Sequence, residues 1–395
     1  MEVERRPWGW LVKGDHGVYR VVNPHPGIYL CTCQGYMFTG SCRHIRAIKF
    51  ARGEVDYMYD LTDIKGIGPS YKAKLIEMGI NNIVQLAAAS PEDIREIFGD
   101  KAEEIIRQAK EKAQKMMEFK TAFEDLDRMR IIRGHITTGS RALDHLIDPC
   151  CHLPEKYRPP RVGGVETFSI TSIWGPFGVG KSQLCHQLAV NAQLPMGMGG
   201  LRGEDPVRVC YIETESGTFR HERIIEMAEA VGLDPEEVLK NILLIRAFDV
   251  DQQYAAYEKV AANAVRLNIR VVIVDSFSAR FREVFTGRET FSGRAKKLIQ
   301  HLEFLNKLAF EQNMAVILTH QVYGSPTPYA TGPILWGGHT VKHVATLHLQ
   351  LELESCSKDA NNPWAKVKAT VVDHPSIPKV STTFYITPQG IRDSR

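Results

Sequence analysis

The alternation of apolar and polar positions changes along this 395-residue chain and predicts four parts. From about residue 131 onward, short apolar runs alternate with amphipathic helical stretches, which is the pattern of a parallel β-sheet covered by helices. The expected strands include Thr167 to Ile173, Val207 to Ile212, Arg270 to Asp275 and Met314 to Gln321. Residues 131–395 are therefore predicted to form an α/β core.

The residues before the core carry other patterns. Residues 57–118 have helical periodicity, and residues 119–130 are interpreted as a linker. Residues 1–56 are rich in aromatic residues, glycine and cysteine and contain short strand-like runs, which indicates a small separate module. Within the core, the prolines of Asp148 to Gly164 favour a surface loop, although its adjacent cysteines and His152 are also candidate metal ligands.

Composition excludes several classes of protein. A hydrophobic content of 44% and a charged content of 24% are ordinary for a soluble globular protein. No apolar run approaches the roughly 18 residues that a membrane helix requires, and the N-terminus lacks the apolar stretch of a secretory signal. A cytoplasmic protein is expected. The net charge of +3 is too small to indicate nucleic-acid binding by itself, so that argument has to rest on local patches.

The strongest chemical signal is a glycine-rich loop between a predicted strand and a helical run. The loop has the form G-x-x-x-x-G-K-S. Its glycines allow several backbone N–H groups to face inward, and the helix N-terminus adds partial positive charge. Lys181 would reach the outer phosphates of a nucleotide, and Ser182 would bind Mg²⁺. The residues expected at this nucleotide site are Gly175, Gly178, Gly180, Lys181, Ser182 and Gln183.

Polar residues end three of the predicted strands. Asp275 follows an apolar run, and at the carboxyl edge of a parallel sheet it would hold Mg²⁺ through water. Glu215 lies just beyond the strand that ends at Ile212, where a carboxylate can polarise an attacking water. Gln321 ends another strand and is suited to sensing a γ-phosphate. The sequence thus predicts a nucleotide-hydrolysing site.

A cysteine and histidine cluster lies near the N-terminus. Cys31, Cys33, Cys42 and His44 supply three thiolates and one imidazole, which satisfy a closed tetrahedral Zn²⁺ site. Such a site would help to fold a segment too small to form a core alone. The order C-x-C, C-x-H resembles the SWIM zinc finger, so residues 1–56 are predicted to form a SWIM-type finger.

A glycine turn lies in the helical part of the chain. Gly66 and Gly68 permit a tight turn between two helices, and backbone N–H groups there can hold a phosphate without reading bases. The segment resembles the helix-hairpin-helix module, and residues 57–118 are therefore predicted to contact DNA. A helical packing domain with an ordinary glycine turn is the alternative interpretation.

A basic stretch follows Asp275. This stretch contains six positive residues and two negative ones, Glu283 and Glu289, so its net charge is +4. Such residues neutralise phosphates and make DNA affinity depend on salt. The positive residues are Arg280, Arg282, Arg288, Arg294, Lys296 and Lys297. A second loop, Tyr323 to Trp336, is rich in proline and glycine and offers aromatic side chains that can stack on bases.

Seven motifs in order resemble the archaeal RadA and eukaryotic recombinase family. They are the phosphate loop, Y-I-E-T-E-S-G-T-F-R-H-E-R, V-V-I-V-D-S, T-H-Q-V, G-G-H-T-V-K-H, D-H-P-S-I-P and G-I-R-D. The likeness covers about residues 60–395. It implies a RecA-type P-loop ATPase core that binds single-stranded DNA as an ATP-dependent filament and exchanges strands with a homologous duplex. A location in the nucleoid, or in the nucleus of a eukaryote, is implied as well.

The resemblance also assigns roles to residues. Lys181 and Ser182 match the positions that hold phosphate and Mg²⁺, and Glu215 matches the catalytic glutamate. Gln321 matches the sensor that links ATP to the DNA-binding loops. The residues that match the adenine-stacking arginine, the histidine near the γ-phosphate and the cap from a neighbouring subunit are Arg223, His343, Asp373 and Pro375.

Two further sets of residues follow from the resemblance. Phe119 and Ala122 resemble the F-x-x-A motif that docks into an adjacent protomer, and head-to-tail contacts of this kind build open filaments. Arg282, Arg288 and Arg294 match family arginines that face the DNA axis.

The sequence departs from the family pattern at several positions. Ser216 interrupts the usual T-E-G-T-F, Glu213 replaces the usual Asp, His320 replaces the common Asn, and the second loop lacks the usual basic residues. Three hypotheses therefore remain: a filament-forming recombinase, an accessory paralog that assists another recombinase, and a KaiC-like ATPase that shares only the core.

Overall fold

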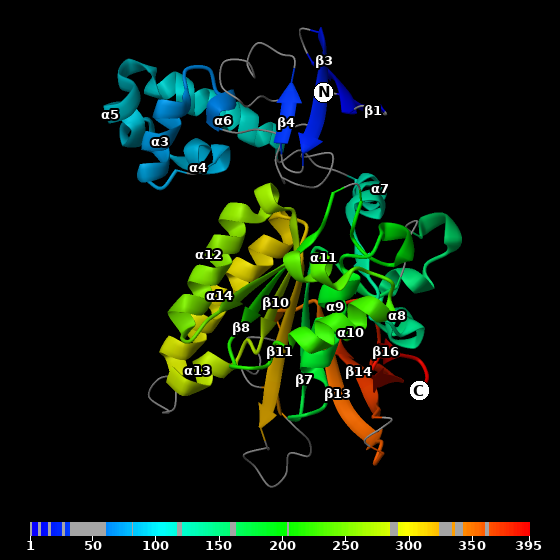
Figure 1. Cartoon of the computed structure of the whole chain (residues 1–395). Coiled ribbons are helices and arrows are strands. Elements are labelled where there is room, and N and C mark those ends of the chain that lie inside the picture. The colour runs from blue at the N-terminus through cyan, green and yellow to red at the C-terminus, as the bar shows by residue number, and fades with distance from the viewer. Residues whose placement is uncertain are drawn as a thin grey trace. The chain divides into compact units, whose positions relative to one another are not determined.

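The computed structural model describes residues 2–6, 9–14, 17–25, 28–31, 61–80, 82–116, 121–158, 163–203, 205–284, 291–323, 334–335, 343–359 and 363–395. The chain divides into two compact units, Met1–Arg128 and Met129–Arg395. Figure 1 shows the larger unit in green to red and the smaller one in blue to cyan.

The larger unit is built on a ten-stranded sheet. Six strands run parallel in the order β13-β7-β11-β10-β8-β9, and β14, β15 and β16 extend the β13 edge in antiparallel pairs. The strands are β7 (Ser169–Gly175), β8 (Arg208–Glu213), β9 (Ile242–Arg246), β10 (Ile269–Asp275), β11 (Ala315–Tyr323), β12 (Ile334–Leu335, paired with β11), β13 (Leu347–Cys356), β14 (Ala365–Asp373), β15 (Val380–Thr387) and β16 (Gly390–Arg392).

Helices cover both faces of this sheet (Figure 1). One face packs against α8 (Arg141–Ile147), α9 (Lys181–Asn191), α10 (His221–Ala230) and α11 (Pro235–Lys240), and the other against α12 (Val250–Leu267) and α14 (Phe291–Glu311). All seven residues of β7 are buried, as expected for a strand covered on both sides. The predicted α/β class with a mostly parallel sheet is thereby confirmed.

The parallel register places the polar strand ends side by side. Gly175 lies opposite Gln321 in the β7–β11 pair, and Asp275 lies opposite Glu213 in the β10–β8 pair. Because β11 also pairs with β10, these four positions share one edge of the sheet. The order of the strands therefore assembles the site that the sequence motifs predict.

Shorter elements lie between the main strands and helices of the larger unit. They are β5 (His135–Ile136), β6 (Val165–Glu166), α13 (Ala279–Val284) and the 3₁₀ turns η3 (Pro149–His152), η4 (Glu155–Tyr157) and η5 (Met196–Met198). The segment that begins at Asp148 was predicted to be a surface loop, and this prediction is wrong at its start, where Asp148 and Cys150 are buried. The Asp148 carboxylate accepts hydrogen bonds from the amides of Cys150 and Gly163, so it ties both ends of the segment to the core.

The smaller unit contains a bundle of short helices. It comprises η1 (Leu61–Asp63), α3 (Pro69–Glu77), α4 (Ile83–Ala88), α5 (Pro91–Phe98), η2 (Gly99–Lys101) and α6 (Ala102–Met116). Leu75, Leu86 and Ile94 are fully buried in its core. Gly66 has φ +102° and Gly68 is the N-cap of α3, so both predicted turn glycines lie between η1 and α3.

An antiparallel sheet precedes these helices. It comprises β1 (Glu2–Arg6), β2 (Gly9–Gly14), β3 (Gly17–His25) and β4 (Ile28–Cys31), paired in chain order. Cys31 ends β4, whereas Cys33, Cys42 and His44 lie outside the described residues.

The region predicted to be a linker is partly helical. The helix α7 (Ala122–Ile132) begins at Ala122, which is exposed, and Phe119 lies outside the described residues. This helix contains no glycine or proline that would break it. It was not predicted because its apolar and polar residues show little amphipathic pattern. None of the helices in the described part of the chain combines the length and the apolar character that crossing a bilayer demands.

Candidate nucleotide site

The phosphate loop leaves the sheet at the carboxyl end of β7 and enters α9. A Cβ atom on Gly175 would lie 2.4 Å from the backbone oxygen of Leu351, so only glycine fits there. Gly180 is the N-cap of α9 with φ +100°, and a Cβ atom there would meet Ile386 at 2.2 Å. These two glycines allow the backbone to turn tightly just before α9. In such a turn the backbone amides of the loop and of the helix N-terminus can point at a bound phosphate.

Lys181 lies beneath this loop. Its ammonium donates hydrogen bonds to the backbone oxygens of Gly175, at 2.9 Å, and Pro176, at 2.8 Å. Burial lowers the pKa of Lys181, while the nearby carboxylates of Asp275 and Glu215 act in the opposite direction. The side chain is thus held against the loop by its backbone, within the field of two carboxylates.

Asp275 is a buried carboxylate with two hydroxyl partners. The Tyr211 hydroxyl donates to Oδ2 at 2.8 Å, and the Thr319 hydroxyl donates to Oδ1 at 2.5 Å. Tyr211 belongs to β8 and Thr319 to β11, so the strands on each side of β10 fix this carboxylate. The arrangement holds a negative charge at the sheet edge close to Lys181.

Glu213 and Glu215 have different environments although they are two residues apart. Glu213 accepts hydrogen bonds from the amides of Gly217 and Phe219 and from Arg246. Burial raises the pKa of Glu213, but these donors outweigh burial and lower it overall. Glu213 therefore closes the turn that follows β8.

Glu215 points instead toward the edge of the sheet. It accepts hydrogen bonds from Gln321 Nε2 at 2.6 Å and from Arg282 Nη2 at 3.4 Å. Burial raises the pKa of Glu215, and the charge of Asp275 adds to this effect. The structure thus brings Glu215, Gln321, Asp275 and Lys181 together, as the sequence predicted.

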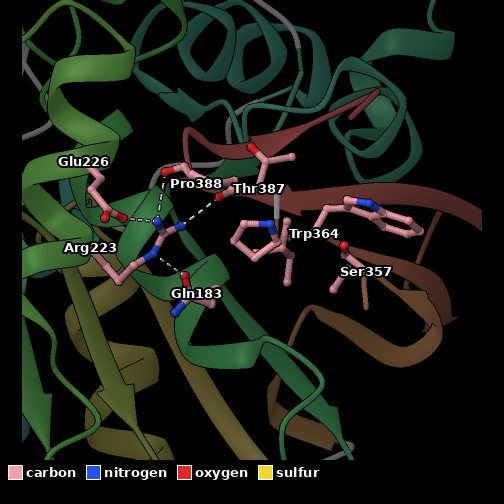
Figure 2. Close-up of a pocket in the computed structure, with 10 residues that line it drawn as sticks. Gln183, Arg223, Glu226, Ser357, Trp364, Thr387 and Pro388 are labelled. Carbon is pink, nitrogen blue, oxygen red and sulfur yellow. Dashed lines mark hydrogen bonds and ion pairs between the residues drawn. The ribbon is translucent and has the colours of Figure 1, made fainter. Parts of the chain in front are cut away.

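A cavity of about 490 Å³ lies beside the first turn of α9. Figure 2 shows the Arg223 side chain at its wall, with its guanidinium bonded to Gln183 Oε1 at 2.8 Å and to the backbone oxygens of Thr387 and Pro388 at 3.0 and 2.9 Å. Trp364 and Ser357 also line the cavity, on the side away from Arg223 in this view. The cavity offers a flat cation and an aromatic ring within reach of the phosphate loop, which suits a planar heterocycle.

Other predicted residues are not part of this cluster. His343 is helical and exposed, and Asp373 and Pro375 lie exposed at the end of β14. Arg282 is on α13 and Arg294 is on α14, whereas Arg288 lies outside the described residues. Gly66 and Gly68 belong to the smaller unit.

Several residues of the site were missed by sequence reasoning. Tyr211 and Thr319 each lie on a strand that was predicted correctly, but their hydrogen bonds depend on which strands are neighbours. Trp364 lies in the turn between β13 and β14, where an aromatic residue among polar ones was the only signal. His320, noted as unusual, is fully buried, and burial lowers its pKa to about 3.

The sequence of this chain was compared with family models and with curated proteins. A family model described as Rad51 matches residues 127–394, and one described as a SAM-like helix-hairpin-helix tandem matches residues 58–111. The chain is 40% identical over 339 residues to the DNA repair and recombination protein RadA of Aeropyrum pernix, covering 85% of this chain and 97% of the relative. It is 40% identical over 338 residues to the RadA protein of Ignicoccus hospitalis, covering 84% and 95%. For the RadA protein of Metallosphaera sedula the identity is 39% over 337 residues, with coverage of 84% and 95%.

The buried Asp275 carboxylate yields a prediction for stability. Tyr211→Phe removes a charge-assisted hydrogen bond and should lower the free energy of unfolding by about 1–3 kcal/mol. Scanning calorimetry of the full chain would measure the shift. Tyr254→Phe, at a half-buried tyrosine of α12, is the matched control and should change little. Equal losses in both variants would contradict a special contribution from the bond to Asp275.

Proposed function

Because this chain belongs to the Rad51 family, we propose that it is an ATP-dependent DNA recombinase. It binds single-stranded DNA as a filament and promotes homologous pairing and strand exchange in DNA repair. The observation that carries this proposal is the cluster of Lys181, Asp275, Glu215 and Gln321 at the carboxyl edge of the sheet, beside a glycine loop shaped for phosphate.

The phosphate loop would hold the ATP phosphates. The backbone amides after Gly178 and the ammonium of Lys181, which exchanges its bonds to backbone oxygens for bonds to phosphate, supply the positive field. The residues present fit Mg²⁺, because the Ser182 hydroxyl and the fixed Asp275 carboxylate are oxygen ligands. When bound, that ion would neutralise phosphate charge.

Glu215 is the proposed catalytic carboxylate. It is held by Gln321 and lies in the field of Lys181, so its oxygens are aimed at the region where the outer phosphates would lie. In that position it would orient an attacking water and accept its proton. The bond between Gln321 and Glu215 supports this role for Glu215 although Ser216 follows it in the chain.

Gln321 connects hydrolysis to the DNA-binding loops. It directly follows the buried part of β11, and two residues later the strand reaches Tyr323, where the second predicted loop begins. A change in the Glu215–Gln321 bond when the γ-phosphate leaves would be passed along the strand. We infer that this bond links the state of the nucleotide to DNA affinity.

The cavity at Arg223 is the proposed site of the adenine. The guanidinium is fixed by Gln183 and by two backbone oxygens, so its flat face is preorganised to stack on the base. His343, Asp373 and Pro375 would then act across the interface to the next protomer, with Phe119 and Ala122 providing the docking motif.

DNA contacts would come from both units. Arg282, Arg288 and Arg294 would neutralise backbone phosphates near the filament axis. In the smaller unit, which matches a helix-hairpin-helix model, the turn at Gly66 and Gly68 would contact the backbone of single-stranded or duplex DNA. Cys31, Cys33, Cys42 and His44 would bind Zn²⁺ in a SWIM-type finger that contacts DNA or a partner recombinase.

An accessory paralog is the second candidate function. The absence of basic residues from the second loop favours it, because that loop would then hold DNA less tightly. The match of residues 58–111 to a helix-hairpin-helix model argues against a KaiC-like ATPase.

Formation of a D-loop by the purified chain, with ATP, Mg²⁺ and homologous single-stranded DNA, tests the main proposal. We expect product from the wild-type chain and none from Lys181→Ala, because the outer phosphates lose their cation. Intact binding of ATP and DNA without D-loop product would overturn the recombinase assignment in favour of the accessory paralog. Turnover of ATP by Lys181→Ala at the wild-type rate would overturn the assignment of the nucleotide site.

Nucleotide affinity should depend on Arg223. Arg223→Ala should raise the Kd for ATP about tenfold, since a cation–π contact in a partly desolvated site contributes roughly 1–2 kcal/mol. Titration with a fluorescent ATP analogue would measure it. Arg220→Ala, which removes an exposed arginine three residues away, is the control. The base site lies elsewhere if the two variants bind ATP equally well.

Zinc content tests the finger. Replacing Cys42 by Ser should lower the bound zinc by about one atom per chain, because the loss of one thiolate from a four-ligand site weakens zinc binding strongly. Elemental analysis of the dialysed protein gives the count. Unchanged zinc in Cys42→Ser would rule out the proposed ligand set.

A further inference from the structure

A second group of metal-ligating side chains lies inside the core unit, away from the nucleotide site. His135 is on β5, Glu166 on β6 and Cys150 in η3. One ring nitrogen of His135, the Cys150 Sγ and a carboxylate oxygen of Glu166 all lie within 4.8 Å of one another. His135 and Glu166 are register partners in the β5–β6 pair, so the backbone itself sets their spacing.

The Asp148 carboxylate contacts this group through His135. Its Oδ2 lies 3.1 Å from His135 Nδ1, and the Asp148 side chain has no exposure to solvent. The Cys150 amide donates to the same carboxylate at 2.7 Å, so Asp148 also fixes the turn that brings Cys150 to the cluster. One carboxylate thus orients two of the three candidate ligands.

One ring nitrogen of His135 has no partner among the described residues. The residue is 5% exposed, and while Nδ1 faces the Asp148 carboxylate, Nε2 makes no hydrogen bond within the described part of the chain. Buried polar atoms without partners are rare because each costs free energy of desolvation. A buried imidazole facing a thiol and a carboxylate therefore calls for an additional partner.

We propose that His135, Cys150 and Glu166 bind a divalent transition-metal ion, with Zn²⁺ as the best match. One imidazole, one thiolate and one carboxylate are ligand types that Zn²⁺ accepts, and a water molecule can fill the fourth tetrahedral position. Asp148 then serves as the outer carboxylate that holds Nδ1–H, so that Nε2 is the nitrogen that binds the metal.

The charges of the cluster fit a divalent ion. Arg133 lies 3.3 Å from Glu166 and is the cation of the group. With Cys150 as thiolate, the three negative charges of Asp148, Glu166 and Cys150 balance Arg133 and a divalent cation. Without the ion, the Cys150 thiol lies 3.8 Å from Glu166 Oε1 and donates to it, and this is the arrangement that an experiment has to distinguish from the metal site.

The position of the site indicates what it would do. It joins the segment that starts at Asp148 to the β5–β6 pair, so a bound ion would fasten this insertion to the core. Because the ligands are buried, the role we assign is structural. The site is independent of the proposed recombinase activity, since none of its residues belongs to the nucleotide site.

The first experiment counts metal in the full-length chain. We expect two zinc atoms per chain in the wild-type protein, one of them from the N-terminal finger. Cys150→Ser should lose one atom, whereas Cys151→Ser, at the adjacent half-buried cysteine, should lose none. Equal zinc in the wild type and in Cys150→Ser would overturn the proposal.

A second measurement does not depend on the folding of that variant. In a chain with Cys31, Cys33 and Cys42 all replaced by Ser, added Co²⁺ should give tetrahedral visible bands and a single-thiolate charge-transfer band. The charge-transfer band should disappear on further replacement of Cys150 and persist on replacement of Cys151. Absence of that band in the triple variant would overturn the site, whatever the outcome of the D-loop assay.

Discussion

The parallel register of the four central strands is the constraint on which the site depends. Gly175 opposite Gln321 and Asp275 opposite Glu213 bring residues from distant parts of the chain to one edge. A slip of one residue would turn every side chain of a strand to the other face. Both faces are packed by helices, so such a slip would also bury different volumes in both apolar clusters. The hydrophobic core therefore fixes the geometry of the polar edge.

The two carboxylates at the end of β8, Glu213 and Glu215, have different roles because their environments differ. Glu213 and Glu215 differ little in sequence context, but amide donors and Arg246 lower the pKa of Glu213, whereas burial and Asp275 raise that of Glu215. Neighbouring carboxyl groups whose pKa values are driven apart commonly divide structural and reactive tasks. Glu213 reaches the amides of Gly217 and Phe219 across the turn that contains Ser216, so it is held by that turn.

Much of the fold and of the central site could be predicted from sequence. The phosphate loop is contiguous, and the strands that carry Asp275 and Gln321 are apolar runs with turns after them, so local pattern was sufficient. The partners of Arg223 could not be predicted, since Thr387 and Pro388 meet it only after the C-terminal strands pack beside α10. Tyr211 and Thr319 gave no signal for the same reason, because strand order decides that they bracket Asp275.

The interpretation of the segment at Asp148 went wrong for a different physical reason. Its prolines and charged residues predict exposure, and composition gives no weight to one carboxylate that anchors both ends. The two-residue strands β5 and β6 are too short to show periodicity, so their pairing could not be anticipated. Yet that pairing sets His135 against Glu166, and the anchored turn adds Cys150. Buried ligand clusters of this kind arise from tertiary structure, so sequence spacing alone has no means of finding them, whereas the N-terminal cysteines were predicted to bind zinc from their spacing alone.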